Sequence, residues 1–170
     1  MMGWRAWVLG ACLGALSALA QGAEPITKHG VVLLQSSKLL EERVASIDAM
    51  AEYVRAVEAA ARDGVLASPS KRPAAGFIVV AVKPGERSRV WLDFDSSSNF
   101  QTSREIVTKV GALKPFEARK GPVVFALKVG LWGASESKRV APSPSEWKAA
   151  TQQAGRQLEL DELVDNVWRD

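Results

Sequence analysis

The sequence predicts an α+β domain built around a three-stranded antiparallel sheet. The first observation is an unbroken, β-branched apolar run at residues 77–82, which is typical of a strand buried on both faces. The second is a period-two alternation of apolar and polar residues at 89–94, together with a long segment at 123–132 that has one apolar and one mixed face. The third is helical spacing of apolar residues around these segments. We therefore expect a long N-terminal helix, one helix inserted between the second and third strands, and two C-terminal helices.

The first helix is expected at residues 36–62. Its apolar residues recur at spacings of three and four, which places one stripe on one side of the helix: Leu40, Val44, Ile47, Ala51, Val54, Val57 and Ala61. Gly64 follows, and glycine suits the left-handed position that ends a helix. We expect the helix to stop there and a loop with Pro and Ser residues to follow at 66–75.

The first two strands are expected to form a β-hairpin. Between them lies Lys83-Pro84-Gly85-Glu86, in which proline presets the first central position of a turn and glycine tolerates a positive φ at the second. The second strand alternates between an apolar face and a mixed face. The apolar face carries Val90, Leu92 and Phe94, and the mixed face carries Arg89, Trp91 and Asp93.

The inserted helix is expected to begin at a capping box formed by Thr102 and Glu105, and to end before Pro115. The third strand then covers residues 123–132. One of its faces is wholly apolar, and the other is mixed and includes Lys128 and Trp132.

A loop at residues 133–143 precedes the two C-terminal helices. Ser143, Pro144 and Glu146 form a capping-box pattern with proline at the first helical position, and Gly155 is placed to end this helix. The last helix, at residues 161–168, has an apolar stripe that needs a partner surface. We expect both helices to fold back over the open face of the sheet and to bury Trp91 or Trp132.

Residues 1–23 have the composition of a cleavable export signal. Arg5 precedes an uncharged segment rich in leucine, alanine and glycine. Small residues at Ala18 and Ala20 suit signal peptidase, and Ala23 offers a later cut. We expect cleavage after Ala20 or Ala23, which leaves one periplasmic domain at residues 24–170 without a membrane span.

Two alternatives remain open for the N-terminal segment. Its uncharged run is close to the roughly 18–20 residues that span a bilayer, so an uncut segment would anchor the protein in the inner membrane. Leu9-Gly10-Ala11-Cys12 also matches a lipoprotein box, in which Cys12 would be acylated. The apolar stretch before Cys12 is short for a signal of this kind.

Composition argues against several functional classes. The chain has 22 basic and 19 acidic residues, and the leader contains only Arg5 among them, so the mature net charge is near +2. A small, dispersed surplus is not typical of a nucleic-acid binder. Cys12, the only cysteine, lies in the leader, so the mature domain has no disulfide or thiol chemistry. His29 is the only histidine and is expected to be a solvated residue of the mature N-terminus, so no Cys/His zinc site and no cofactor are expected.

The element order resembles the C-terminal domain of the TonB/TolA type. The local similarity is best at Leu113-Lys114-Pro115-Phe116 and at Gly121-Pro122-Val123-Val124, and it covers about two-thirds of the mature chain. The resemblance implies a two-layer core in which helices cover one face of the sheet. TonB proteins have an uncleaved anchor and a long Pro-rich spacer, and neither is expected in this chain. The two C-terminal helices expected here are additional to the TonB-type domain. The resemblance therefore indicates a fold and not an energy-transducing role.

Two arrangements of residues suit hydrolytic chemistry. The S-x-x-K pattern of penicillin-recognising acylases occurs at residues 68–71 and 135–138, but proline interrupts the first copy and the second lies in an expected loop. Asp93 and Asp95 point to one side of a strand, where two carboxylates can do acid and base work or simply face water. A small periplasmic hydrolase that uses these groups is the alternative functional hypothesis.

The preferred hypothesis is a non-enzymatic module that binds another envelope protein. Arg89 and Trp91 occupy the mixed face of one strand, and Lys128 and Trp132 that of another. Aromatic and cationic side chains on a shared sheet face suit partner binding, and they suit an apolar layer beneath the C-terminal helices equally well. The sequence does not indicate an oligomeric state.

Overall fold

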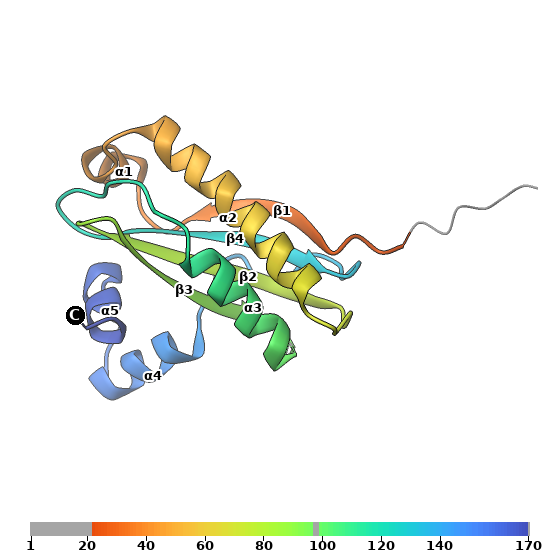
Figure 1. Cartoon of the computed structure of the whole chain (residues 1–170). Helices are drawn as coiled ribbons and strands as arrows, with labels where there is room; N and C mark the ends of the chain where they lie inside the picture. Colours follow the sequence, from red (N-terminus) through yellow and green to blue (C-terminus); the bar gives the residue numbers. More distant parts are fainter. Residues whose placement is uncertain (1–21, 97–98, 170) are drawn as a thin grey trace, which may run out of the picture.

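A computed structural model describes residues 22–96 and 99–169 and arranges them in three layers (Figure 1). The middle layer is an antiparallel sheet of order β1-β4-β2-β3. Its strands are β1 (Ile26–Leu33), β2 (Ala74–Lys83), β3 (Arg87–Phe94) and β4 (Val123–Leu131). One face is covered by α1 (Ser37–Arg43), α2 (Ile47–Ala67) and α3 (Phe100–Gly111), and the other by α4 (Ser145–Ala154) and α5 (Leu160–Val167). The two-layer, three-stranded expectation is therefore wrong.

The fourth strand, β1, is the element that the sequence analysis missed. It pairs with β4 along its whole length, with a bulge between Lys28 and Gly30. Only Ile26 of this strand is buried, because β1 lies at the edge of the sheet and the helices cover it poorly. His29 is exposed as expected, but it lies in this strand and not in a terminal tail.

The structure confirms the strands that were predicted at residues 77–82 and 123–132. Residues 77–82 of β2 are fully buried, and β4 is buried on both faces except at Lys128. The turn between β2 and β3 has a positive φ of 86° at Gly85, as its sequence predicts. This hairpin places β3 at the second edge of the sheet.

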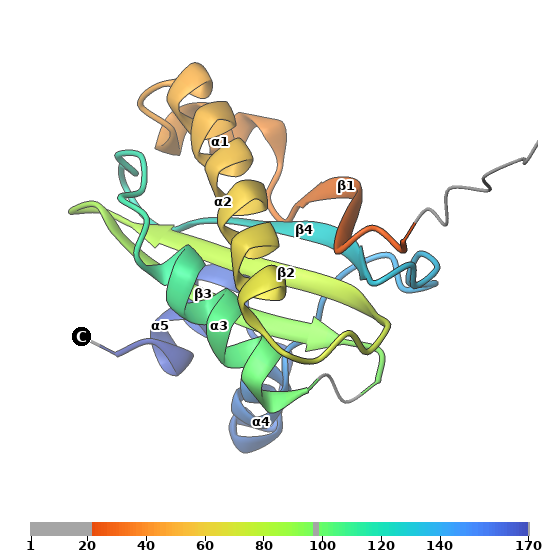
Figure 2. The same cartoon turned by 45° about the vertical axis from the view of Figure 1, so that its right-hand side comes forward.

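The single helix expected at residues 36–62 is two helices. The chain leaves α1 at Val44, which bridges to Ala118, and Ser46 then caps α2. Gly64 does not end α2, which continues to Ala67. A Cβ at Gly64 would lie 2.7 Å from the Cα of Ile106, so glycine is required where α2 crosses α3. Figure 2 shows these two helices side by side over the sheet.

The C-terminal helices fold back over the sheet, as expected. Trp91 is only 4% exposed and lies in an apolar core with Trp147, Leu163 and Val164. The rings of Trp91 and Trp147 meet edge to face at 5.6 Å. The C-terminal end is fixed to the sheet by Lys83, whose Nζ donates to the Trp168 carbonyl at 2.9 Å.

Both predicted capping boxes are wrong. Asn99 caps α3 by accepting from the Gln101 and Thr102 N–H groups, and the Thr102 hydroxyl is buried against Ser68. Pro144 is the residue that precedes α4, and it supplies no side-chain cap. Gly155, with φ of 65°, ends α4 as expected.

The predicted export signal lies almost wholly in residues 1–21, outside the described part of the chain. Within residues 22–96 and 99–169, no helix is long and apolar enough to cross a membrane.

Candidate functional site

The outer edge of β3 carries backbone groups without a partner strand in the described part of the chain. Asp95 N–H donates to the Ala75 carbonyl at 2.8 Å, in register with the β2–β3 pairing. Because hydrogen-bonded pairs alternate along an antiparallel ladder, every second residue of β3 from Arg87 to Asp93 also directs its backbone groups toward β2. The remaining residues direct their N–H and C=O groups to the free edge: Ser88, Val90, Leu92 and Phe94.

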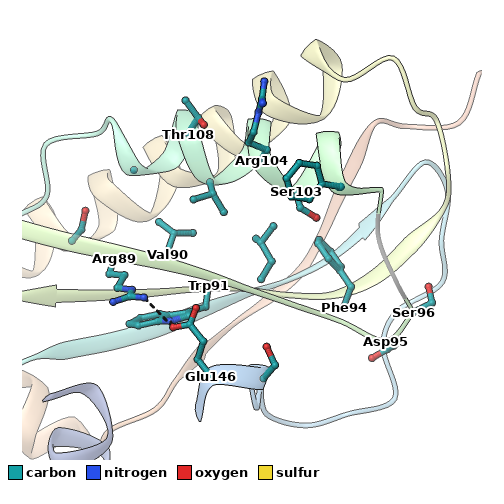
Figure 3. A pocket seen from close by; sticks show the side chains of 16 residues that line it. Arg89, Val90, Trp91, Phe94, Asp95, Ser96, Ser103, Arg104, Thr108 and Glu146 are labelled. Carbon is teal, nitrogen blue, oxygen red and sulfur yellow. Dashed lines mark hydrogen bonds and ion pairs between the residues drawn. The ribbon is translucent and has the colours of Figure 1, made fainter. Parts of the chain in front are cut away.

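This edge forms the floor of a groove of about 950 Å³ (Figure 3). One wall is α3, which contributes Phe100, Arg104 and Val107, and the other is the start of α4, which contributes Ser145 and Glu146. Phe100 is 77% exposed, so the α3 wall presents a large apolar side chain to solvent. A long groove with a strand edge at its base and an exposed apolar wall can accommodate an extended chain.

The α4 wall is fixed to β3 by Glu146. Its Oε2 atom accepts from Trp91 Nε1 at 2.9 Å and from the Arg89 guanidinium at 3.0 Å, and Figure 3 shows the three side chains together. Arg89 also lies over the Trp91 ring and donates to the Val167 carbonyl at 2.7 Å. Two of the predicted partner-surface residues therefore lie in the wall and floor of the groove, and Trp91 is largely covered by α4 and α5.

The other two predicted surface residues lie elsewhere. Lys128 is half-buried and pairs with Glu136 at 2.7 Å, and this hydrogen bond lowers the pKa of the Glu136 carboxyl. Trp132 follows β4 with a positive φ of 49°, which breaks the strand alternation and turns the ring toward the α2 side of the sheet. Lys71 lies over that ring at 5.5 Å. Lys128 alternates with Val124 and Ala126 and so lies on the same sheet face as Arg89 and Trp91, whereas Trp132 lies on the opposite face.

Asp93 and Asp95 are brought together, but both bind Arg139. The guanidinium contacts Asp93 Oδ2 at 2.6 Å and Asp95 Oδ1 at 2.7 Å, while the Ser143 N–H donates to Asp93. Burial alone would lower the pKa of Arg139, but its hydrogen bonds to both carboxylates outweigh this effect and raise it. These groups fasten the loop before α4 to the end of β3.

The S-x-x-K serines do not meet their lysines in a catalytic geometry. Ser68 is buried and bonds to the Thr102 hydroxyl at 2.7 Å, while Lys71 lies over Trp132. In the second copy, the buried serine is Ser137, which donates to Asp95, and Lys138 is exposed. Neither pattern begins a helix, so neither has the serine-to-lysine reach that acyl transfer needs.

Sequence analysis missed the α3 wall of the groove. Phe100, Arg104 and Val107 recur at spacings of four and three, so they form a second stripe beside the buried residues Ile106 and Val110. This second stripe was the available signal. It went unused because the helix was expected to begin at Thr102, which left Phe100 outside it.

The described residues contain no group of three or more His, Cys, Asp and Glu side chains placed to hold a metal ion. The sequence matches no protein-family model, no curated protein and no solved structure.

Proposed function

We propose that this protein is a non-enzymatic binding module of the bacterial cell envelope, and that it holds a segment of another envelope protein in the groove along β3. The observation that carries the proposal is the groove itself, because its α3 wall leaves Phe100 and Val107 in solvent beside a strand edge. When a partner covers exposed apolar side chains beside a concave, partly polar surface, their removal from water lowers the free energy of the complex.

The polar groups of the groove support binding over hydrolysis. A general base needs a carboxylate that is free to take a proton. Asp95 is hydrogen-bonded to Arg139 and Ser137, and Glu146 is hydrogen-bonded to Arg89 and Trp91. Both carboxylates are thus already engaged as hydrogen-bond acceptors of neighbouring side chains, so no observation in the groove favours the hydrolase alternative.

A photo-crosslinking experiment tests the groove as the binding site. A photoreactive amino acid is placed at Val107 in the groove, or at Leu66, which is exposed on α2 outside the groove. We expect discrete adducts with an envelope protein from Val107 only. The Val107 adducts should disappear when Gly111→Trp fills the groove, because a side chain there points into open space. They should persist with Ala112→Trp, since Ala112 is exposed but does not line the groove.

The same cells test the envelope location. The export signal predicts a processed protein in the periplasmic fraction, with its N-terminus between residues 21 and 24. Intact-mass measurement of the fractionated protein decides this, and an unprocessed cytoplasmic species would contradict the location. Equal crosslinking from Val107 and Leu66 would instead contradict the groove.

A further inference from the structure

Resting on the proposed function, we infer how the partner segment binds: it adds to the sheet as an extra strand along β3, and it presents an apolar, an acidic and an apolar residue at alternate positions to α3. The ligand is thus an extended peptide segment of another protein. Two independent features support this inference, namely the unpaired backbone edge and the charge pattern of the α3 wall.

The backbone edge supplies the pairing groups. Ser88, Val90, Leu92 and Phe94 direct their N–H and C=O groups into the groove, and no described residue hydrogen bonds to them. Each such group stays solvated until another strand arrives, and strand addition satisfies it without any rearrangement of the sheet. A strand that pairs with the whole of β3 alternates its side chains between the α3 wall and the α4 wall.

The α3 wall matches that alternation. Its groove-side stripe contains Phe100, Arg104 and Val107, whose Cα atoms are separated by about 6 Å and about 4.5 Å along the helix axis. Alternate residues of a strand are about 6.6 Å apart, so side chains at three successive alternate positions can reach the three helix residues. The outer two contacts are apolar and the central one is cationic.

Charge complementarity selects the acidic residue. The two carboxylates of the groove, Asp95 and Glu146, are each paired with an arginine. Arg104 is different, because its side chain is 68% exposed and the only carboxylate within 4 Å in the described structure is that of Glu105, at 3.9 Å. Figure 3 shows Arg104 at the rim on α3. An aspartate or glutamate of the partner would therefore meet an available positive charge there.

The groove favours a single extended segment over the other occupants of a strand edge. A second copy of this chain would bring its own α3 and α4 against the walls of the groove, since those helices flank its β3 in the same way. The opposite sheet edge, β1, has a bulge and the charged Lys28, and both features discourage strand addition.

The test uses a phage-displayed library of random octapeptides, selected on the purified protein and on three variants. The unmodified protein should enrich peptides with the pattern apolar-x-acidic-x-apolar. The Arg104→Glu variant should enrich a basic residue at the central position, and the measured affinity of an acidic peptide should fall about twofold to fivefold or more. Binding should be lost on Gly111→Trp and kept on Ala112→Trp.

Backbone pairing is tested on one enriched peptide by N-methylation at each position in turn. Methyl groups on the nitrogens that face β3 should weaken binding about tenfold or more, and those on the intervening nitrogens should have little effect. Binding of peptides in the groove with no alternating response to N-methylation, or with no response to Arg104→Glu, would overturn strand addition and leave the proposed binding site intact. Failure to select any peptide that Gly111→Trp displaces would overturn both. A dimer that Gly111→Trp dissociates would overturn the choice of partner.

Discussion

The same substitution at two helical glycines should change stability in opposite directions. Gly64 lies inside α2, and Gly111 is the last residue of α3. In an exposed helix, the change from glycine to alanine stabilises a protein by about 0.5–1 kcal/mol, because alanine loses less conformational freedom on folding. This contribution is common to both sites, so their surroundings decide the outcome.

At Gly64 the surroundings oppose the added methyl group. A Cβ there would lie 2.7 Å from the Cα and 2.8 Å from the N of Ile106, and 2.9 Å from the carbonyl carbon of Glu105. These are backbone atoms, which no rotamer change can move, so α2 and α3 must separate. Overpacking costs about 1–3 kcal/mol, and backbone contact places Gly64 at the upper end. After the helix contribution, we expect Gly64→Ala to lose about 2 kcal/mol and to lower the Tm by about 4–8 °C.

At Gly111 no described atom beyond its chain neighbours and its own helix lies within 4 Å of an added Cβ. We expect Gly111→Ala to gain about 0.5–1 kcal/mol and to raise the Tm by about 1–4 °C. Thermal denaturation followed by far-UV circular dichroism measures both variants. A neutral or stabilised Gly64→Ala would refute the close crossing of α2 and α3, and a destabilised Gly111→Ala would refute the open groove beside the end of α3.

Three further substitutions test the apolar core on each face of the sheet and the Arg139 latch, in which Arg139 binds Asp93 and Asp95. Trp147→Ala should cost about 3–5 kcal/mol in urea denaturation, because a side chain only 5% exposed leaves a cavity beside Trp91; a loss below about 1 kcal/mol would contradict the second core. Arg139→Ala should lower the free energy of unfolding by about 2 kcal/mol, because it leaves the 9%-exposed Asp93 carboxylate without its cation. The control Lys138→Ala, on the exposed neighbouring residue, should change it by less than about 0.5 kcal/mol, and equal effects would argue against the latch. Burial raises the pKa of Tyr53, an effect that the Ser88 hydroxyl partly offsets. Folding therefore favours the neutral Tyr53 hydroxyl over the phenolate. The resulting contribution to the free energy of unfolding is fully present below the unfolded-state pKa of about 10, and it is lost as the pH rises through the higher folded-state pKa. The urea midpoint should fall less for Tyr53→Phe than for the unmodified protein between pH 8 and pH 11, and an identical fall would place the ring in a solvated site.

The central strands could be predicted because burial on both faces leaves an unmistakable composition. Residues 77–82 and the apolar face of β4 contain no charged side chain. A short, β-branched apolar run of this kind is typical of a strand that is buried on both faces. The edge strand β1 gives no such signal. Its residues Thr27, Lys28 and His29 are exposed, and a bulge interrupts its period of two, so its sequence is also compatible with a terminal tail.

The capping boxes failed because distant residues compete for the capping groups. The Ser143 N–H donates to Asp93, 50 residues earlier, and the Glu146 carboxylate accepts from Trp91, 55 residues earlier. A local pattern contains no information about such partners, and a charge-assisted bond to a largely buried indole or a bond to a buried carboxylate is stronger than a solvated cap. The same limit explains why Trp132 was placed on the wrong face, since one left-handed residue after β4 reverses the alternation.

The groove itself could be predicted only in part. Sequence analysis identified Arg89 and Trp91 as side chains of one strand face, and it expected the C-terminal helices to cover that face. It could not place β3 at the edge of the sheet, because strand order depends on which strands pair with β2. In the structure, α3 and α4 lie on either side of the free backbone of this edge strand.

The groove is fixed before any partner arrives, and this determines which kind of segment it suits. Glu146 joins α4 to β3 through Trp91 and Arg89, and the Arg139 latch fixes the loop that leads into α4. On the other wall, α3 is packed tightly against α2 at Gly64. Because both walls are held by the two cores, the protein has little conformational entropy to lose on binding, and most of the ordering cost falls on the peptide. Short segments that are already extended lose the least conformational entropy, so they are the partners that the proposed function favours most.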